Sequence, residues 1–577
     1  MLRRLLQELS RPADATLFAE AAALRKSGQL DEAERALRGV LAKAPNSARA
    51  HIHLGIVLAE LGRMAEATAL FARAVAIDPG DPFAHVNLAN AHRRTGASDD
   101  ALRHYRMAVR LQPDLPLAWS NMLRPSLDAC DWDGAQRGLE IILQLRQRGE
   151  RDWPRYIAPM DSLLLPLPAV TRREIADYHA GQLLADRVAP PRRSASRPHA
   201  RLRIAYLSRD FRDHAVGQLV RALFSLHDRT RFELFAYSYG RDDDSRYRRE
   251  IAVGADRFVD VRAESPANTA ARIAGDGIDI LVDLGGYTTD HRLATLAGRP
   301  APIQVHYLGY PGTLGSGLAD YYITDHIASP PGQDAQFAEH LVRLPSSFMV
   351  NDPDQPLADA PPSRSECGLQ AGKIVLCAFH QTAKITQEVF DAWCGILRAV
   401  PDSVLWLKLP GKEARDRLAR GARQRGVDPD RLVYAPDVAC KRDHVARMAA
   451  GDVFLDTFGR YNGHSTVNEA LWAALPVVTI AGEPFASRVA ASLLNAAGIP
   501  ELAAGTAEEY VRLAVSLARD ASRREALRRR LVAARATAPL FDTAGTVRAL
   551  ESAYQAMWEL HDAGTAPRAF SLRGASV

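Results

Sequence analysis

The sequence contains few cysteines, and their spacing excludes the common disulfide and zinc frameworks. Five Cys occur among 577 residues, and no two of them form a Cys-x-x-Cys pair. Zinc sites and small disulfide-rich domains need clustered Cys, because several sulfurs must meet at one metal or across short loops. We therefore expect reduced thiols and no zinc site in this chain.

Long hydrophobic runs are absent as well. No stretch reaches the roughly 18 uninterrupted apolar residues that suggest a membrane span, and residues 1–21 carry charges throughout rather than a signal-type apolar core. The net charge of +5 is small for this length, which disfavours nucleic acid as a partner. These absences predict a cytoplasmic protein of roughly three to four domains that binds neither membrane nor nucleic acid.

A period of 34 residues runs through the N-terminal third. Three residue types recur with this period: Gly at positions 28, 62 and 96, Ala at 33, 67, 101 and 135, and Pro at 45, 79 and 113. This is the helix–turn–helix period of tetratricopeptide repeats. We predict such an array over residues 13–150, with three regular repeats and a degenerate fourth in which Cys130 replaces the Gly.

His53, Asn87 and Asn121 share the same 34-residue spacing and fall in the first helix of their repeats. Stacked repeats form a superhelix with a concave binding face, and an amide side chain can both donate to and accept from a peptide backbone. The favoured interpretation is a concave face that binds protein or peptide acceptors. The alternative is an array that serves only for dimerisation and carries these residues as polar surface.

From Leu202 onward, short β-branched and aromatic runs alternate with helical segments, which is typical of βα units and a parallel sheet. A Pro-rich passage interrupts this alternation, which restarts at Lys373. The pattern predicts two Rossmann-like lobes. The expected segments are a helical connector and linker (151–200), a first lobe (201–350), an inter-lobe linker (351–372), a second lobe (373–565) and a tail (566–577).

Ligands of open α/β sheets bind beyond the carboxyl ends of the strands, so turns that follow strands are the candidate sites. His214 lies in one such turn, where it is either a general base or merely exposed. Lys384 lies in another, and it stands out because only seven of the 73 Lys and Arg residues are Lys. A lysine is a compact point charge suited to a diphosphate. Glycine-rich turns at 285–288 and 308–313 complete this group.

The turn Asn462 to Thr466 separates the predicted strand Val453 to Leu455 from a helix predicted over Glu469 to Ala474. A helix start offers unpaired backbone N–H groups and a positive dipole end, which suit a nucleotide diphosphate. The alternative is an ordinary βα turn in which Ser465 or Thr466 is the N-cap. The turn by itself favours neither interpretation.

Three segments resemble the O-linked N-acetylglucosamine (O-GlcNAc) transferase family. They are RPAPIQVHYLGYPGTLG (299–315), FHQTAKIT (379–386) and YNGHSTVNEALWAALPVVTIAGEPFASRVAAS (461–492), and they follow the repeat array in the family's order. The resemblance implies a metal-independent, inverting glycosyltransferase with two Rossmann-like lobes of the GT-B type. It also implies a UDP-GlcNAc donor, Ser or Thr acceptors on proteins, no cofactor, and a repeat array that guides protein substrates.

The resemblance also implies roles for individual residues. His214 in DFRDH corresponds to the family's proposed catalytic base, and Gln381 and Lys384 in FHQTAK correspond to FNQxxK, whose Lys meets the diphosphate. The remaining donor-binding positions are Ala439, Lys441 and His444 at the uridine, His464, Ser465 and Thr466 at the phosphates, and Glu469 at the ribose.

Three departures from the family pattern concern the donor site. Ser465 replaces Thr, Glu469 replaces a shorter Asp, and Cys440 replaces the Pro before Lys441. Two further hypotheses stay open at this point. One is a related enzyme that uses UDP-glucose or glycosylates Asn, and the other is a tetratricopeptide scaffold that has lost activity. The acceptor and the oligomeric state are not predicted.

Overall fold

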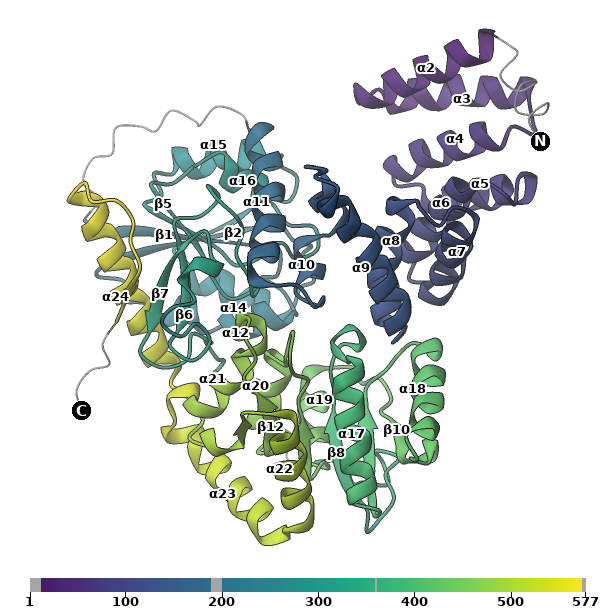
Figure 1. Ribbon diagram of the computed structural model, residues 1–577. Coiled ribbons are helices and arrows are strands. Elements are labelled where there is room, and N and C mark those ends of the chain that lie inside the picture. Colours follow the sequence, from purple (N-terminus) through teal and green to yellow (C-terminus); the bar gives the residue numbers. More distant parts are fainter. Residues whose placement is uncertain (1–11, 188–199, 358–360, 573–577) are drawn as a thin grey trace. The chain divides into compact units, whose positions relative to one another are not determined.

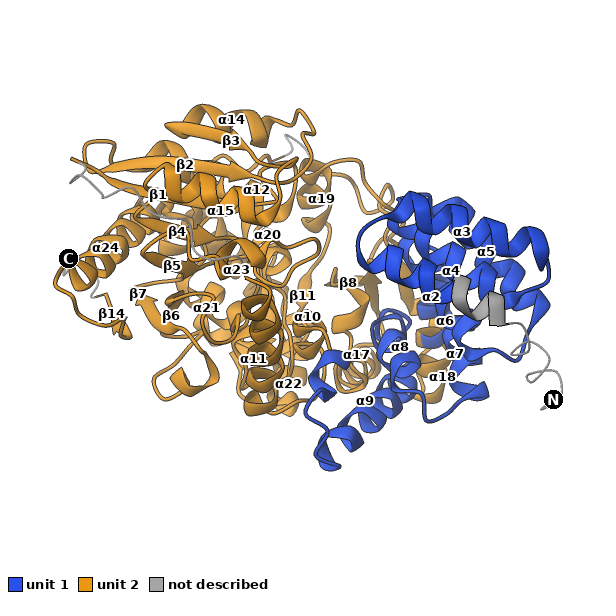
Figure 2. Cartoon of the chain, turned by 90° about the horizontal axis from the view of Figure 1, so that it is seen from above, with its two compact units in different colours: residues 1–156, 410–417 blue, residues 157–409, 418–577 orange. Residues whose placement is uncertain are grey.

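The computed structural model describes residues 12–187, 200–357 and 361–572 (Figure 1). The chain divides into two compact units (Figure 2): residues up to 156 with 410–417, and residues 157–409 with those from 418 onward. Residues 188–199, at the end of the predicted connector and linker, lie outside the described residues. None of the described helices is long and apolar enough to cross a bilayer.

The first unit is built from the predicted antiparallel helix pairs. Gly28, Gly62 and Gly96 end the first helix of their pairs with φ between +78° and +84°, a left-handed conformation that glycine adopts without strain. Cys130 has φ +53° at the equivalent place, so the backbone there is left-handed as at the three glycines, and the degenerate fourth repeat stays a prediction. The helices are α2 (Pro12–Lys26), α3 (Leu30–Lys43), α4 (Ala48–Glu60), α5 (Met64–Ile77), α6 (Pro82–Arg94), α7 (Ser98–Leu111), α8 (Pro116–Asp128) and α9 (Trp132–Gln147).

The repeated alanines form the contacts between these helices. Ala33, Ala67 and Ala101 have no exposed surface, because the small side chain lets neighbouring helices approach closely. His53, Asn87 and Asn121 lie on α4, α6 and α8, the first helices of their pairs as predicted, and all are half-buried. The amide of Asn87 donates to the Phe83 carbonyl of its own helix at 2.8 Å. Peptide binding by these three residues remains a prediction.

A histidine cluster between α6 and α7 makes the repeat array sensitive to acid. The Nδ1 atoms of His85 and His104 lie 3.0 Å apart, so one ring must donate and the other accept. His92 stacks on His104 with ring centroids 5.7 Å apart. Burial, then the neighbouring His85 and Arg103, lower the pKa of His104 from 6.5 to about 4, while Asp100 opposes the shift. The folded array therefore resists a proton that the unfolded chain accepts.

We expect the free energy of unfolding of the repeat array to fall as the pH drops from 6.5 towards 4. In this range the unfolded chain binds more protons, so His104 accounts for about 1 to 2 kcal/mol once the screening of its partly exposed ring is allowed for. Urea denaturation of the full chain between pH 4 and 7.5, followed by circular dichroism, measures this slope. His104→Gln keeps a partner for His85 and should show a flatter slope; an unchanged slope would exclude His104 as its cause.

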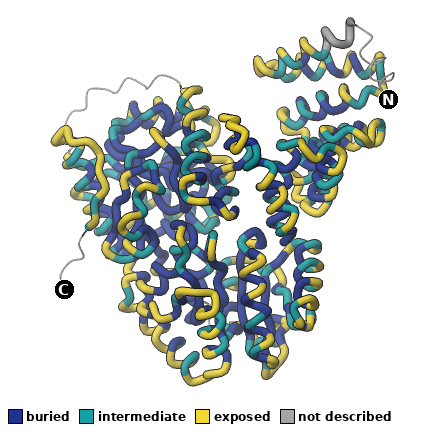
Figure 3. The backbone as a smooth tube through the Cα atoms, in the orientation of Figure 1, coloured by how far each residue is buried: buried dark blue, intermediate teal, exposed yellow. Residues whose placement is uncertain are grey.

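The second unit contains two wholly parallel sheets, which confirms the two predicted Rossmann-like lobes. The central strands of both sheets are buried, whereas the edge strands of the first sheet and the outer helices are partly exposed (Figure 3). The first sheet has the order β14-β7-β6-β5-β4-β1-β2-β3, with β1 (Leu202–Ser208), β2 (Phe232–Ser238), β3 (Arg257–Asp260), β4 (Ile280–Asp283), β5 (Ile303–His306), β6 (Tyr321–Asp325), β7 (His340–Leu344) and β14 (Phe570–Ser571). The second has the order β10-β9-β8-β11-β12-β13, with β8 (Ile374–Ala378), β9 (Ser403–Leu407), β10 (Leu432–Tyr434), β11 (Val453–Leu455), β12 (Val477–Ile480) and β13 (Ala503–Ala504).

The helices of the second unit follow the strands as the alternating pattern predicts. Three strands are not predicted: β7, whose apolar run is interrupted by the charged Arg343, and the two-residue strands β13 and β14. The helices are α10 (Pro159–Ser162), α11 (Ala169–Ala185), α12 (Ala215–Val220), α13 (Leu223–Leu226), α14 (Arg246–Gly254), α15 (Pro266–Gly275), α16 (Leu293–Ala297), α17 (Gln387–Ala399), α18 (Lys412–Gln424, shared by the two units), α19 (Lys441–Met448), α20 (Ser465–Trp472), α21 (Val489–Ala496), α22 (Ala507–Arg519), α23 (Ala521–Thr537) and α24 (Thr543–Asp562).

The chain returns to the first lobe at its C-terminal end. The sequence analysis assigns residues 373–565 to the second lobe, but α24 packs against α13, β5 and β7 of the first. The hydroxyl groups of Tyr554 and Tyr206 lie 3.1 Å apart, and the Glu551 carboxylate accepts from the Asp228 backbone N–H at 2.7 Å. Residues 570–571, expected in a tail, add β14 to the sheet edge beside β7. The chain therefore passes from the first lobe to the second and back again, so two chain connections join the lobes.

Candidate active site

The turn between β11 and α20 is an open helix start rather than a capped junction. His464 is the N-cap residue, and no side chain among the described residues caps the helix. Ser465 and Thr466 lie inside the first helical turn, so the interpretation that one of them is the N-cap is wrong. The helix also begins four residues before the predicted Glu469. Its first N–H groups and its positive dipole end therefore stand available to an anion.

Asp456 holds this turn in place, and the sequence analysis gave it no role. It ends β11 without exposed surface, and its carboxylate accepts from the Gly463 N–H at 2.7 Å and the Thr479 hydroxyl at 2.6 Å. Burial raises its pKa from 3.8 to about 7, although these hydrogen bonds and Lys384 oppose the shift. The only sequence signal is its place directly after a buried strand.

Hydrogen bonds from Asn462 and His464 connect the turn to the segment after β12. The Asn462 amide donates to the Ser487 carbonyl at 2.9 Å, and its backbone N–H donates to the Ala486 carbonyl at 3.0 Å. His464 Nε2 lies 3.0 Å from the same Ala486 oxygen, to which it must donate. Burial, then the charge of Lys384, lower the pKa of His464 to about 3. The imidazole is thus neutral, with its proton on Nε2.

Lys384 reaches the turn from the neighbouring strand. It ends the short 3₁₀ helix Thr382–Lys384 that follows β8. Its Nζ donates to the Asn462 carbonyl at 2.9 Å and lies 3.7 Å from the centre of the Tyr461 ring. Gln381 precedes this helix with an exposed side chain, and its carbonyl accepts from the Lys384 N–H at 3.0 Å. The structure therefore places the ammonium group at the same turn as the start of α20.

Three of the predicted uridine and ribose residues meet on the other side of α20. Lys441 Nζ lies 3.7 Å from one carboxylate oxygen of Glu469, and His444 Nε2 lies 3.6 Å from the other. Arg447 donates to His444 Nδ1 at 2.7 Å, so the proton of the neutral ring is on Nε2 and faces Glu469. Burial, followed by Arg447, lowers the pKa of His444 to about 3. Burial raises the pKa of Glu469, and Lys441 opposes this.

The long side chain of Glu469 makes these contacts possible, because it reaches from α20 to two residues of α19. Ala439 and Cys440 precede α19 as exposed residues of the adjoining loop. The predicted donor-binding residues lie on α19 and the loop before it, on α20 and the turn before it, and on the loop after β8. Contacts join α19 to α20 and Lys384 to the turn, and we call this region the donor surface. Among the described residues, no three His, Cys, Asp or Glu side chains gather as a metal site.

His214 lies apart from this surface, in the loop after β1 of the first lobe. Its side chain is 41% exposed, and Nδ1 lies 3.4 Å from the Asp210 carboxylate. The Val216 N–H donates to the same Nδ1 at 3.3 Å, which leaves the proton of the neutral ring on Nε2. Burial lowers its pKa, and Asp210 opposes this. Both contacts are with residues near it in sequence, Asp210 in the same loop and Val216 in the first turn of α12.

Comparison with known proteins places these features in one family. The model of glycosyl transferase family 41 matches residues 129–361 and 354–550, and two tetratricopeptide-repeat models match residues 18–82 and 58–124. A solved structure of a mutant O-GlcNAc transferase from Thermobaculum terrenum superimposes with a TM-score of 0.67 at 32% identity, covering 95% of this chain and 98% of that one.

Longer eukaryotic relatives match as well. One from Arabidopsis thaliana, named a probable UDP-N-acetylglucosamine–peptide N-acetylglucosaminyltransferase, is 36% identical over 460 residues, which cover 77% of this chain and 47% of the relative. The UDP-N-acetylglucosamine–peptide N-acetylglucosaminyltransferase of Caenorhabditis elegans is 30% identical over 560 residues, with coverage of 75% and 48%. The chain spans about half the length of these curated relatives. The family match over both lobes shows that this protein is a member of glycosyl transferase family 41.

Proposed function

We propose that this protein transfers N-acetylglucosamine from UDP-GlcNAc to Ser or Thr hydroxyls of proteins, with inversion and without a metal ion. The observation that carries the proposal is the meeting of Lys384 and the open start of α20 at a single turn. The names of the similar proteins supply the sugar and the peptide acceptor.

The charge distribution supports this chemistry. Departure of UDP develops negative charge on the diphosphate, and preorganised cations and N–H groups stabilise such charge best in a site that needs no reorganisation. Lys384 supplies the cation, and the backbone of His464, Ser465 and Thr466 supplies the donors. The neutral ring of His464 adds no charge, since its N–H is occupied by Ala486.

The group formed by Lys441, His444 and Glu469 suits the nucleoside end of the donor. The buried Glu469 carboxylate offers acceptors for two ribose hydroxyls. Lys441 and His444 lie within 4 Å of it and keep it oriented. Gln381 and the backbone of Ala439 border the same surface and complete the proposed donor site.

The acceptor side of the proposal rests on the repeat array. The half-buried His53, Asn87 and Asn121 recur along the first helices, where they would contact an extended peptide. The proposed location is the cytoplasm, and no cofactor is required besides the UDP-sugar.

One experiment separates this proposal from its alternatives. Purified protein is incubated with radiolabelled UDP-GlcNAc, UDP-glucose and other UDP-sugars in the presence of lysate, and labelled proteins are analysed by mass spectrometry. N-acetylglucosamine on Ser or Thr supports the proposal. Glucose, or label on Asn, would identify the related enzyme instead, and no transfer or hydrolysis of any UDP-sugar would indicate an inactive scaffold.

His214→Ala is expected to lower the rate of transfer about 10²-fold or more while UDP still binds, because a positioned proton acceptor or donor contributes on this scale. The Nε2 proton deduced from its contacts makes His214 a hydrogen-bond donor that positions the acceptor or the sugar. To act as a base, the ring must first move its proton to Nδ1 and give up the hydrogen bond from Val216. Isothermal titration calorimetry with UDP and steady-state kinetics give the two readouts. A loss of UDP affinity would reassign His214 to donor binding.

A further inference from the structure

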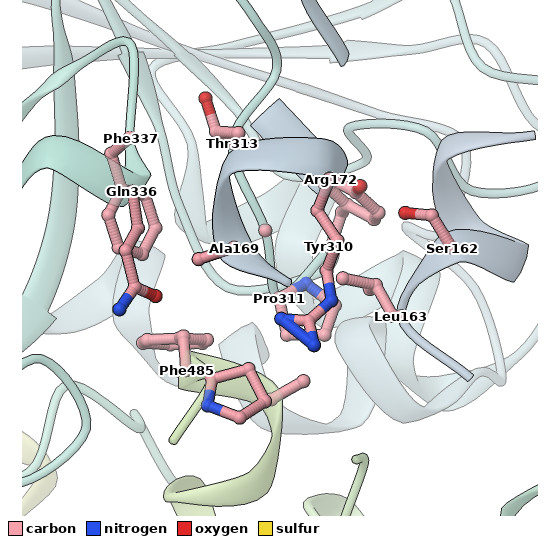
Figure 4. Close-up of a pocket in the computed structure, with 13 residues that line it drawn as sticks. Ser162, Leu163, Ala169, Arg172, Tyr310, Pro311, Thr313, Gln336, Phe337 and Phe485 are labelled. Carbon is pink, nitrogen blue, oxygen red and sulfur yellow. The ribbon is translucent and has the colours of Figure 1, made fainter. Parts of the chain in front are cut away.

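A small pocket adjoins the donor surface within the second unit. Helices α10 and α11, the loop Tyr310–Thr313 after β5, and residues 484–486 form its walls (Figure 4). Tyr310, Phe337 and Phe485 contribute aromatic side chains to its lining. Ala486 belongs to the pocket, and its carbonyl accepts from both Asn462 and His464 of the donor turn. The pocket is therefore one residue away from the proposed diphosphate site.

Arg172 of α11 points its guanidinium into this pocket (Figure 4). Its Nε is buried and has no hydrogen-bond partner among the described residues. The adjacent Arg173 is different, since it pairs with Asp177 at 3.1 Å. Burial lowers the pKa of Arg172, and the nearby charge of Glu483 opposes this without coming within ion-pair distance. Arg172 as a whole is half-buried, but its Nε is withdrawn from water without a partner. An unpaired buried donor on a cation is costly, so an arriving anion is favoured.

We propose that this pocket binds the carboxylate of an Asp or Glu side chain of the acceptor polypeptide, so that Arg172 determines acceptor specificity. The inference rests on the proposed transfer to proteins and adds a substrate class to it. A guanidinium pairs with a planar carboxylate through two parallel hydrogen bonds. Arg172 supplies one positive charge between aromatic walls, which matches the single negative charge of a carboxylate. A doubly charged phosphate would keep part of its negative charge unneutralised in this pocket.

The position of the pocket supports a protein-borne carboxylate. Residues 484–486 connect it to the turn at which the sugar would be released, so an acceptor whose hydroxyl reaches that turn would pass the pocket with a neighbouring residue. The hydroxyl of Thr313 is already held by Glu339 at 2.7 Å. Arg172 is therefore the group in the pocket suited to recognise the negative charge of the acceptor carboxylate.

The test compares acceptor peptides that differ only in Glu or Gln at successive positions around one Ser. With wild-type protein and UDP-GlcNAc, Glu at one or two positions should raise kcat/KM about 10- to 100-fold over Gln, as expected for a hydrogen-bonded charge pair. In Arg172→Gln this preference should disappear, with the loss falling on the Glu peptides. Arg187→Ala, which removes an exposed Arg just beyond α11, should retain the preference.

Three results would overturn the inference. The first is equal rates for Glu and Gln peptides at every position in the wild type. The second is a preference for Glu that survives in Arg172→Gln. The third is a stabilisation of the wild type by acetate or phosphate that added acceptor peptides do not reduce. The first needs no variant, so it holds even if Arg172→Gln does not fold. Absence of transfer to all peptides together with absence of UDP-GlcNAc hydrolysis would instead refute the proposed function.

Discussion

Lys384→Ala is expected to lower kcat/KM for transfer from UDP-GlcNAc about 10³-fold, the upper end of the cost of removing one preorganised charge donor. The ammonium group lies 2.9 Å from the Asn462 carbonyl, next to the proposed path of the diphosphate. It should act mainly when UDP leaves, because the negative charge grows as the bond to the sugar breaks. The loss should therefore fall on kcat more than on the affinity for UDP-GlcNAc.

Single-turnover kinetics with a radiolabelled donor separate these two effects. Lys412→Ala is the matched control, because the Lys412 side chain is 81% exposed and pairs only with Asp416 in the next helical turn. That variant should retain wild-type rates. Substantial kcat in Lys384→Ala would show that another group neutralises the leaving diphosphate, and the start of α20 would then be the remaining candidate.

Gly463→Ala is expected to reduce the affinity for the donor about 100-fold, because displacing a positioned site by around 1 Å has costs of this size. An added Cβ would lie 2.6 Å from Val467 Cγ2, 2.9 Å from Asp456 Oδ1 and 3.1 Å from His380 Cε1. All three neighbours are held in place, since Asp456 and His380 are buried and Val467 is part of α20. The turn must therefore move away from Asp456 and lose the 2.7 Å hydrogen bond between them.

The same substitution should lower the free energy of unfolding by about 1 to 3 kcal/mol, the usual cost of overpacking a core. Titration calorimetry with UDP and urea denaturation measure the two effects. Gly395→Ala is the control: it lies in α17, where only the Arg398 side chain comes within 4 Å of the added Cβ, and it should leave donor binding unchanged and raise stability by up to about 1 kcal/mol. Normal UDP affinity in Gly463→Ala would contradict the role given to this turn.

The eukaryotic relatives are about twice as long as the part of them that this chain matches. All residues proposed at the donor, and the two lobes as far as residue 550, lie within the matched family region. Fewer than 25 residues separate the predicted lobes, at 351–372. The proposed acceptor pocket beside Arg172 draws on the connector helix α11 as well as on both lobes, which gives that helix a role beyond linking.

Local patterns in the sequence determined much of this protein. The 34-residue period predicted the helix pairs, and even the φ +53° of Cys130 follows from its place at a Gly position. The alternation of apolar runs predicted two parallel sheets with polar turns after their strands. These features depend on residues close to one another along the chain, since helix and strand periodicity and turn chemistry act over a few residues.

The tertiary structure alone decided how those turns become a site. Asp456 received no role from the sequence because its carboxylate acquires one only when it meets Gly463 and Thr479. The return of α24 to the first sheet was missed because order along the chain does not specify which lobe an amphipathic helix covers. Ser465 and Thr466 would each suit an N-cap by residue type, but His464 is the N-cap residue and both lie inside the first turn of α20. The long-range contacts among buried polar groups, which no local pattern records, shape this βα junction into the proposed anion site.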